Sequence, residues 1–150
     1  MIKIIKTNKK NKDFRILIKE LDAYLEKTDG EDHVFYKEFN RLDKINNIVV
    51  AYKNKFAVGC GAFRKIDIHT VEIKRMYVKK EHRGLGIAKT ILTFLESWAQ
   101  QEKFKYSVLE TGDKQQEAIQ LYKKAGYLKI PNYGQYAQME NSNCFKKSLV

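Results

Sequence analysis

One short stretch of this 150-residue sequence combines backbone and side-chain features that suit an anionic ligand. It reads Arg83-Gly84-Leu85-Gly86-Ile87-Ala88, and an amphipathic helical pattern begins within it. Backbone N–H groups at a helix start beside glycines are well suited to bind a phosphate. The stretch lacks the Gly-Lys-Ser/Thr of a nucleotide P-loop and the third glycine of a dinucleotide fingerprint. Taken alone, it predicts an anion site and nothing more specific.

Cysteine and histidine are sparse and do not group into any other reactive pattern. Cys60 and Cys144 are the two cysteines, which argues against a disulfide framework in a chain of this size. His33, His69 and His82 lie far apart and no Cys-x-x-Cys pair occurs, so we expect no metal site. Neither cysteine has an activating neighbour pattern, and both are expected to be packing residues.

The elements that must position the glycine stretch follow from apolar periodicity. Apolar residues recur every three or four positions from Lys12 to Lys27 and from Leu85 to Gln101, which predicts two helices. A shorter helix is predicted after Asp113, with Asp113 as its cap and Gly126 as its terminator. A weak helical pattern also runs from Val34 to Leu42. Strands are predicted at Ile2 to Thr7, Asn46 to Tyr52, Phe56 to Arg64, Thr70 to Lys79, Lys105 to Thr111 and Asn143 to Leu149.

Two local irregularities are predicted within these strands. Gly59 and Gly61 inside one strand imply a bulge or a close approach of another segment. The apolar side of the next strand changes between Ile73 and Met76, so a bulge is expected near Lys74-Arg75. The order β-α-α-β-β-β-α-β-α-β indicates one α/β or α+β domain over residues 1–150, with a mixed sheet flanked by helices.

Composition limits the classes of function. With 29 Lys plus Arg against 18 Asp plus Glu, the net charge is +11, which favours phosphate-bearing partners. The lysines are dispersed along the chain, so a basic nucleic-acid-binding module remains an alternative without a recognisable motif. No apolar run reaches the length of a membrane span, and the N-terminus does not read as a secretory signal. We therefore expect a cytoplasmic protein with no membrane partner.

Beyond the glycine stretch, the sequence resembles the GNAT superfamily of N-acetyltransferases. The acetyl-CoA motif of that family has Arg or Gln, two residues, Gly, one residue, then Gly or Ala, and Arg83, Gly86 and Ala88 match it. Glu72 to Val78 before the motif, and the Leu-Tyr-x-x-x-Gly-aromatic element from Leu121 to Tyr127 after it, extend the resemblance. It covers about Gly59 to Tyr127 and is similar to a group of small bacterial acetyltransferases.

The resemblance implies a fold and a cofactor site. A mostly antiparallel sheet would contain a bulged strand that splays from its neighbour and binds the pantetheine arm of acetyl-CoA through its backbone. The pyrophosphate would rest on amides from Arg83 to Ala88. Gln115 stands where many members carry an asparagine that contacts the cofactor. The implied cofactor residues are Met76, Tyr77, Val78, Arg83, Gly84, Leu85, Gly86, Ile87, Ala88, Gln115 and Tyr122, and no metal is implied.

The resemblance also implies catalytic roles. Glu72 matches a position that some members use as general base, Glu110 is the second candidate, and a structural ion pair is the alternative for both. Tyr122 matches the tyrosine that protonates the leaving thiolate, although it also lies where a core tyrosine would pack.

The acceptor is expected to be a primary amine of a small molecule or peptide, bound by variable segments that include Tyr36, Glu110, Tyr133 and Tyr136. Glu31 and Asp32 could attract a cationic amine. A non-catalytic acyl-CoA-binding protein of the same fold is a further alternative. The oligomeric state is left open, and a homodimer is compatible with the sequence.

Overall fold

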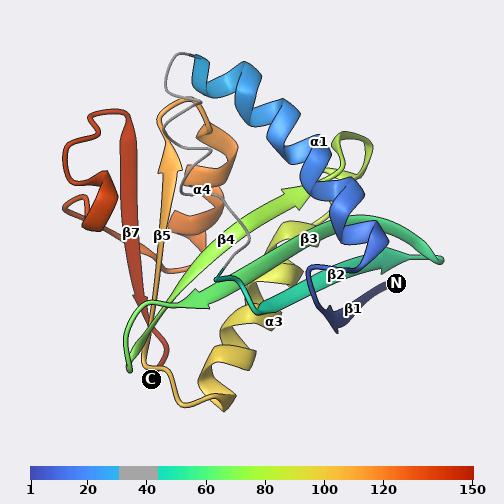
Figure 1. Cartoon of the computed structure of the whole chain (residues 1–150), viewed down its shortest axis with the longest axis horizontal. Coiled ribbons are helices and arrows are strands. Elements are labelled where there is room, and N and C mark those ends of the chain that lie inside the picture. The colour runs from blue at the N-terminus through green and yellow to red at the C-terminus, as the bar shows by residue number, and fades with distance from the viewer. Residues whose placement is uncertain (31–43) are drawn as a thin grey trace.

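The computed structural model describes residues 1–30 and 44–150 (Figure 1). The weak helical pattern from Val34 to Leu42, and Tyr36 with it, lie outside these ranges. The described helices are α1 (Lys12–Asp29), α3 (Ile87–Gln101) and α4 (Gln116–Lys124), with short 3₁₀ turns at Lys80–His82 and Gly134–Tyr136. The strands are β1 (Ile2–Thr7), β2 (Asn47–Lys53), β3 (Phe56–Lys65), β4 (Thr70–Val78), β5 (Tyr106–Gly112), β6 (Leu128–Ile130) and β7 (Ser142–Ser148).

The seven strands form one sheet in the order β1-β2-β3-β4-β5-β7-β6. Neighbours are antiparallel except β4 and β5, which are parallel. This arrangement confirms the mixed, mostly antiparallel sheet expected from the sequence. No helix within the described ranges is long and apolar enough to cross a membrane.

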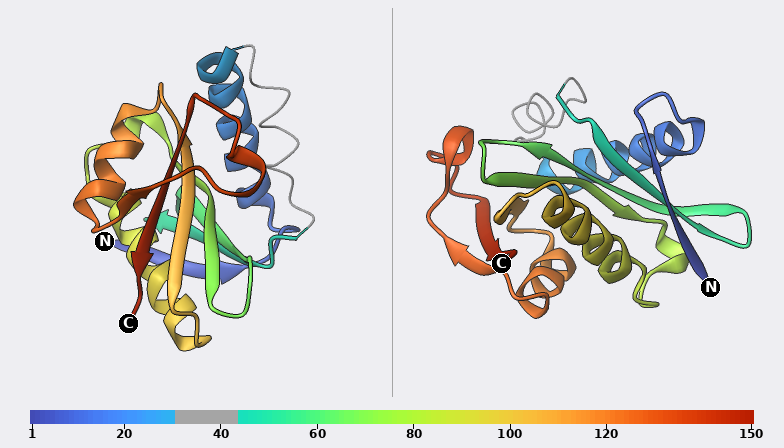
Figure 2. Two further views of the ribbon diagram at one scale, coloured as in Figure 1. Left: turned by 90° about the vertical axis from the view of Figure 1, so that its left-hand side faces the viewer. Right: turned by 90° about the horizontal axis from the view of Figure 1, so that it is seen from below.

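Helices cover both faces of the sheet, as Figure 2 shows. On one face, Phe14, Leu17 and Ile18 of α1 pack in a core with Ile48 and Val50 of β2. On the other face, α3 and α4 pack over a larger core that includes the alternate β2 residues Val49 and Ala51. The continuous apolar run in β2 is therefore explained, because a strand buried on both faces needs no polar side.

The bulge predicted near Lys74-Arg75 is present and is built around Gly61. In the β3–β4 register, Ala62 pairs with Lys74 and Cys60 pairs with Tyr77, so Gly61 alone opposes two β4 residues. Arg75 adopts a left-handed φ of 57° at this point. A Cβ on Gly61 would lie 2.7 Å from both Ile91 Cγ2 and Met76 Sδ. The glycine therefore permits the close approach of α3 to the bulge.

β4 and β5 separate just before the bulge. Their parallel pairing runs only from Thr70↔Tyr106 to Glu72↔Val108. From Ile73 to Val78, β4 remains paired with β3 but diverges from β5, and the two arrows spread apart in Figure 1. The splayed strand implied by the resemblance is therefore a feature of this sheet, and among the described residues no strand pairs with that backbone edge of β4.

Two details of the C-terminal third differ from the sequence-based expectation. α4 begins at Gln116 with Gln115 as its N-cap, not at Asp113. The Asp113 carboxylate instead accepts a hydrogen bond from Asn143 Nδ2 at 2.5 Å, across to β7. The short edge strand β6 was not predicted, because three residues before Pro131 give too little alternation to detect. Gly126, with φ of 97°, follows the end of α4 as predicted.

Candidate active site

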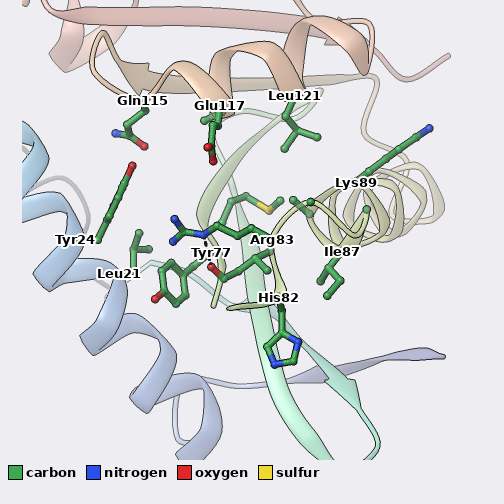
Figure 3. A pocket seen from close by; sticks show the side chains of 16 residues that line it. Leu21, Tyr24, Tyr77, His82, Arg83, Ile87, Lys89, Gln115, Glu117 and Leu121 are labelled. Atoms are coloured by element: carbon green, nitrogen blue, oxygen red, sulfur yellow. Dashed lines mark hydrogen bonds between the residues drawn. The ribbon is translucent and has the colours of Figure 1, made fainter. Parts of the chain in front are cut away.

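A cleft of about 600 Å³ opens where β4 and β5 diverge (Figure 3). β4 forms one wall through Met76, Tyr77 and Val78, and the starts of α3 and α4 form two others. Nine of the residues predicted to bind the cofactor line it: Met76, Tyr77, Val78, Arg83, Gly84, Gly86, Ile87, Ala88 and Gln115.

One end of the cleft is a helix N-terminus. Gly84 and Gly86 have φ of 80° and 79°, a conformation that glycine adopts without strain. The first hydrogen bond inside α3 runs from Thr90 N–H to Gly86 O at 3.1 Å, so the preceding N–H groups have no carbonyl partner in the helix. Apart from the adjoining residues in the chain, no atom of the described residues lies within 4 Å of a Cβ built on either glycine. The turn is therefore open and presents donors and a positive helix end to an anion.

Arg83 lies in the middle of the cleft, as Figure 3 shows. Its Nε donates to Val78 O at 2.9 Å. Its Cζ lies 5.4 Å from the ring centroid of Tyr24 and 5.6 Å from that of Tyr77, within cation–π range of both. The guanidinium is thus held at the cleft by α1 and β4 together.

Several cleft residues were not identified from the sequence. Leu21 and Tyr24 come from α1, which the sequence identifies only as an amphipathic helix. The periodicity predicts which face of α1 is buried. It does not predict which residues of that face lie beside the splayed edge of β4. The remaining additions are His82, Lys89, Glu117, Ala118 and Leu121.

A second, smaller pocket adjoins the cleft on the α1 side of the sheet. The two share Leu21, Met76 and Gln115 in their walls. The small pocket has a volume of about 80 Å³. Its other lining residues are Leu25, Glu72, Ile73, Lys74, Arg75, Glu110 and Tyr136.

Glu72 is the centre of a buried polar cluster beside this pocket. Its side chain is 1 % exposed and accepts a hydrogen bond from Arg64 Nε at 2.7 Å. Lys74 Nζ lies 3.4 Å from the same carboxylate oxygen, and Tyr133 OH donates to the other oxygen. Lys74 Nζ also lies 3.3 Å from Tyr136 OH. The cluster therefore connects β3, β4 and the segment before β7.

Burial shifts the proton equilibria of this cluster. Burial lowers the pKa of Lys74, and the nearby Glu72 carboxylate partly opposes that shift. Burial, reinforced by Glu72, raises the pKa of Tyr133 above its ordinary value of 10.0. Burial, with Glu110 and then Glu72, raises that of Tyr136 in the same way. Both phenols are therefore hydrogen-bond donors at neutral pH.

Tyr122 lies on α4, one residue after the cleft residue Leu121. Its side chain is 6 % exposed and packs edge-to-face on Tyr127, with ring centroids 5.8 Å apart. Burial, together with the Glu110 carboxylate, raises the pKa of its phenol, which therefore stays protonated. Two of the predicted cofactor residues, Tyr122 and Leu85, are not among the residues that line the cleft. Leu85 is 61 % exposed.

The structure separates the predicted catalytic and acceptor residues into two groups. Glu72, Glu110 and Tyr136 line the small pocket, and Tyr133 supports it through Glu72. Tyr122 packs instead on the α3 and α4 side of the sheet. Tyr36, with Glu31 and Asp32, lies outside the described residues.

Comparison with known proteins identifies the family. The sequence profile of the acetyltransferase (GNAT) family matches residues 14–127. The chain is 34% identical over 138 residues to a protein of Azospirillum brasilense named IAA acetyltransferase, and the match covers 89% of this chain and 88% of that protein.

Solved structures agree with this result. A Klebsiella pneumoniae protein assigned to the acyl-CoA N-acyltransferases superposes with a TM-score of 0.85 at 28% identity, covering 100% of this chain and 99% of that one. A GNAT family acetyltransferase from Elizabethkingia anophelis, solved with acetyl-CoA bound, gives a TM-score of 0.71 at 18% identity and covers 98% and 97% of the two chains, which shows the shared fold. The profile match spans most of the chain and includes the splayed β4 and the glycine turn. This chain therefore belongs to the acetyltransferase (GNAT) family and is an N-acetyltransferase.

Proposed function

We propose that this enzyme transfers the acetyl group of acetyl-CoA directly to a primary amine. The observation that carries the proposal is the cleft beside the splayed part of β4. It runs from the β4 backbone edge that no described strand pairs with to the N-terminus of α3. A ligand with amide groups along a flexible chain and phosphates at one end would match both features. Met76 and Val78 would hold the pantetheine arm, and the amides of Ile87 to Lys89 the pyrophosphate.

The side chains of the cleft fit this ligand. Its apolar surface comes from residues such as Leu21, Val78 and Ile87, which would cover methylene groups. Arg83 and Lys89 add positive charge to the same cleft, where phosphates would be stabilised. When bound, acetyl-CoA supplies an acyl group already activated as a thioester. The chain then has to deprotonate the amine, orient it and stabilise the leaving thiolate.

Glu110 is the better-supported base of the two candidates. The Glu72 carboxylate is already in contact with Arg64, Lys74 and Tyr133, and these contacts support a structural role. Glu110 lines the small pocket from β5 and is half-buried there. It is also close enough to Tyr122 to raise the pKa of that phenol. We assign proton acceptance from the amine to Glu110 and pocket support to Glu72.

Tyr122 is the proposed acid. Its raised pKa keeps the proton on the phenol, so the hydroxyl can donate to a thiolate as the carbon–sulfur bond breaks. A backbone N–H of Met76 or Val78 would polarise the thioester carbonyl. No acetyl-enzyme is needed in this scheme, since both cysteines are fully buried.

Calorimetry with acetyl-CoA, followed by thiol release over a panel of amines, tests the function. We expect binding in the micromolar range and thiol release that depends on an amine. Gly86→Glu should weaken acetyl-CoA binding at least tenfold, because it places a carboxylate at the open helix start. Gly126→Glu is the matched control, since Gly126 also has a positive φ but lies beyond α4. No binding to the wild type at hundreds of micromolar would contradict the proposal.

The assignment of the base is tested by two isosteric changes. Glu110→Gln should lower kcat about a hundredfold and remove the acidic limb of the pH–rate profile. Glu72→Gln should leave that limb in place and raise KM for the amine, because Tyr133 and Lys74 lose their shared partner. The reverse pattern would make Glu72 the base.

A further inference from the structure

The small pocket beside the cleft has an unusual charge pattern. Two acidic residues, Glu72 and Glu110, line it together with two basic residues, Lys74 and Arg75. A pocket for a simple cationic amine would need only the acids. Because electrostatic complementarity determines which ligand is selected, walls of both signs favour a ligand head that carries both signs.

Arg75 is the most informative of these residues. It is 7% exposed, and its Nη2 donates to Asp22 Oδ1 at 2.8 Å and, more weakly, to Ile18 O at 3.4 Å. Its Nε is buried and has no hydrogen-bond partner within the described parts of the chain. A buried donor left unsatisfied lowers the stability of the folded state, which is a free-energy cost. An acceptor oxygen from a ligand in this pocket would remove that cost.

Lys74 adds a second cation to the same wall. Its Nζ lies 3.4 Å from Glu72 Oε1 and is 5% exposed. Burial disfavours the ammonium and lowers the pKa of Lys74. A further negative group in the pocket would therefore stabilise the charged form of Lys74 as well as satisfy Arg75.

The size of the pocket limits the head group. A volume of about 80 Å³ accommodates on the order of five water-sized groups, since each needs roughly 15 Å³. The head of an α-amino acid has five heavy atoms: the nitrogen, the α-carbon and the three atoms of the carboxylate. The adjoining cleft, which shares Leu21 and Met76 with the pocket, leaves room for a bound acyl donor.

We propose that the acceptor of this enzyme is a free α-amino acid, with its carboxylate at Arg75 and Lys74 and its amine toward Glu110. This inference rests on the proposed function. The amine gives one proton to Glu110 and its nitrogen bonds to the acetyl carbon. The carbon–sulfur bond breaks, and the departing thiolate takes a proton from Tyr122. The second proton that the former ammonium loses passes to the Tyr122 oxygen and restores the phenol. The products are an N-acetyl amino acid and CoA.

Matched acceptors test the inference on the wild-type enzyme. Alanine, leucine, phenylalanine and glutamate would each be compared with their primary amides and with the amines that lack the carboxylate. We expect kcat/KM for at least one amino acid to exceed that of both its analogues at least tenfold. Equal or better turnover of the amides or amines across the panel would overturn the inference. Acetyl-CoA binding, measured separately, reports on the proposed function alone.

Substitutions in the small pocket test where the carboxylate of the acceptor binds. Arg75→Gln should reduce the preference for the acid over its amide, measured as the ratio of their kcat/KM values, to about twofold or less. Arg15→Gln is the matched control, because Arg15 is exposed on α1. If Arg75→Gln does not fold, Lys74→Met provides the same readout. A variant that slows acid and amide equally would show that these cations do not recognise a carboxylate.

Discussion

At the scale of single residues, Tyr122 is the proposed acid, and its removal should affect chemistry more than binding. Its phenol is buried and stays protonated, and its helix lines the cleft proposed for the acyl donor through Ala118 and Leu121. We expect Tyr122→Phe to lower kcat about a hundredfold, in the range of a lost general acid. The Kd for acetyl-CoA should change by less than about twofold. Single-turnover thiol release and calorimetry measure the two quantities.

Tyr127→Phe is the control for this change. Tyr127 packs on Tyr122 and its hydroxyl lies 2.7 Å from Ser107 Oγ, so the variant removes a neighbouring buried phenol of the same kind. It should cost about 1 kcal/mol of stability and leave kcat unchanged. Equal losses of kcat in both variants would indicate that Tyr122 acts through packing.

The residues of the glycine turn were predictable from the sequence, because they are contiguous and their chemistry is local. The residues that contact Glu72 were not predictable in this way. Arg64 is eight positions away and Tyr133 is 61 positions away, and only the fold brings them to one carboxylate. For the same reason, the sequence ranked Glu72 above Glu110 as a base, whereas the base that we propose is Glu110.

At the scale of elements, Gly61 sets how closely α3 approaches the bulge in β4. A Cβ there would lie 2.7 Å from Ile91 Cγ2 and 2.9 Å from Leu95 Cδ1. Gly61→Ala should therefore destabilise the fold by about 1 to 3 kcal/mol, as overpacking does. Gly59→Ala should cost at least as much, since its Cβ would meet the Tyr77 backbone oxygen at 2.8 Å. Urea denaturation measures both, and an unchanged midpoint would contradict the packing.

The regular elements were largely predictable. Three- and four-residue periodicity identified α1 and α3, and alternation with β-branched residues identified six of the seven strands. The start of α4 was placed too early, because Asp113 is a good cap by type but is drawn to Asn143 of β7. A capping prediction from sequence cannot detect a competing partner 30 positions later.

At the scale of the whole molecule, stability should fall in alkaline solution. Burial raises the pKa of the Cys60 thiol to about 12 from an ordinary value of 9.0. Above pH 9 the unfolded chain loses this proton while the native chain keeps it, so the free energy of unfolding decreases as pH rises. The stability difference between wild type and Cys60→Ala should shrink by roughly 3 kcal/mol by pH 11. Urea titrations at pH 7 and pH 11 test this, and a constant difference would refute it.

The order of strands in the sheet was not accessible from the sequence. The order of elements along the chain indicated a mixed sheet with helices, but β7 inserts between β5 and β6 by pairing over its whole length with β5. Such pairing depends on contacts between distant segments, which local patterns do not encode.

The early end of the β4–β5 pairing has a dynamic consequence. Three register pairs from Thr70 to Glu72 are all that join the parallel strands, so the two halves of the sheet are least coupled at the cleft. Local opening is easiest where backbone bonds are fewest. Amides of β4 that face the gap should exchange with deuterium quickly in the free enzyme and slowly once acetyl-CoA is bound, while those paired with β3 stay protected in both states. The sheet would then become more rigid between β4 and β5 each time the acyl donor binds and more mobile each time CoA leaves.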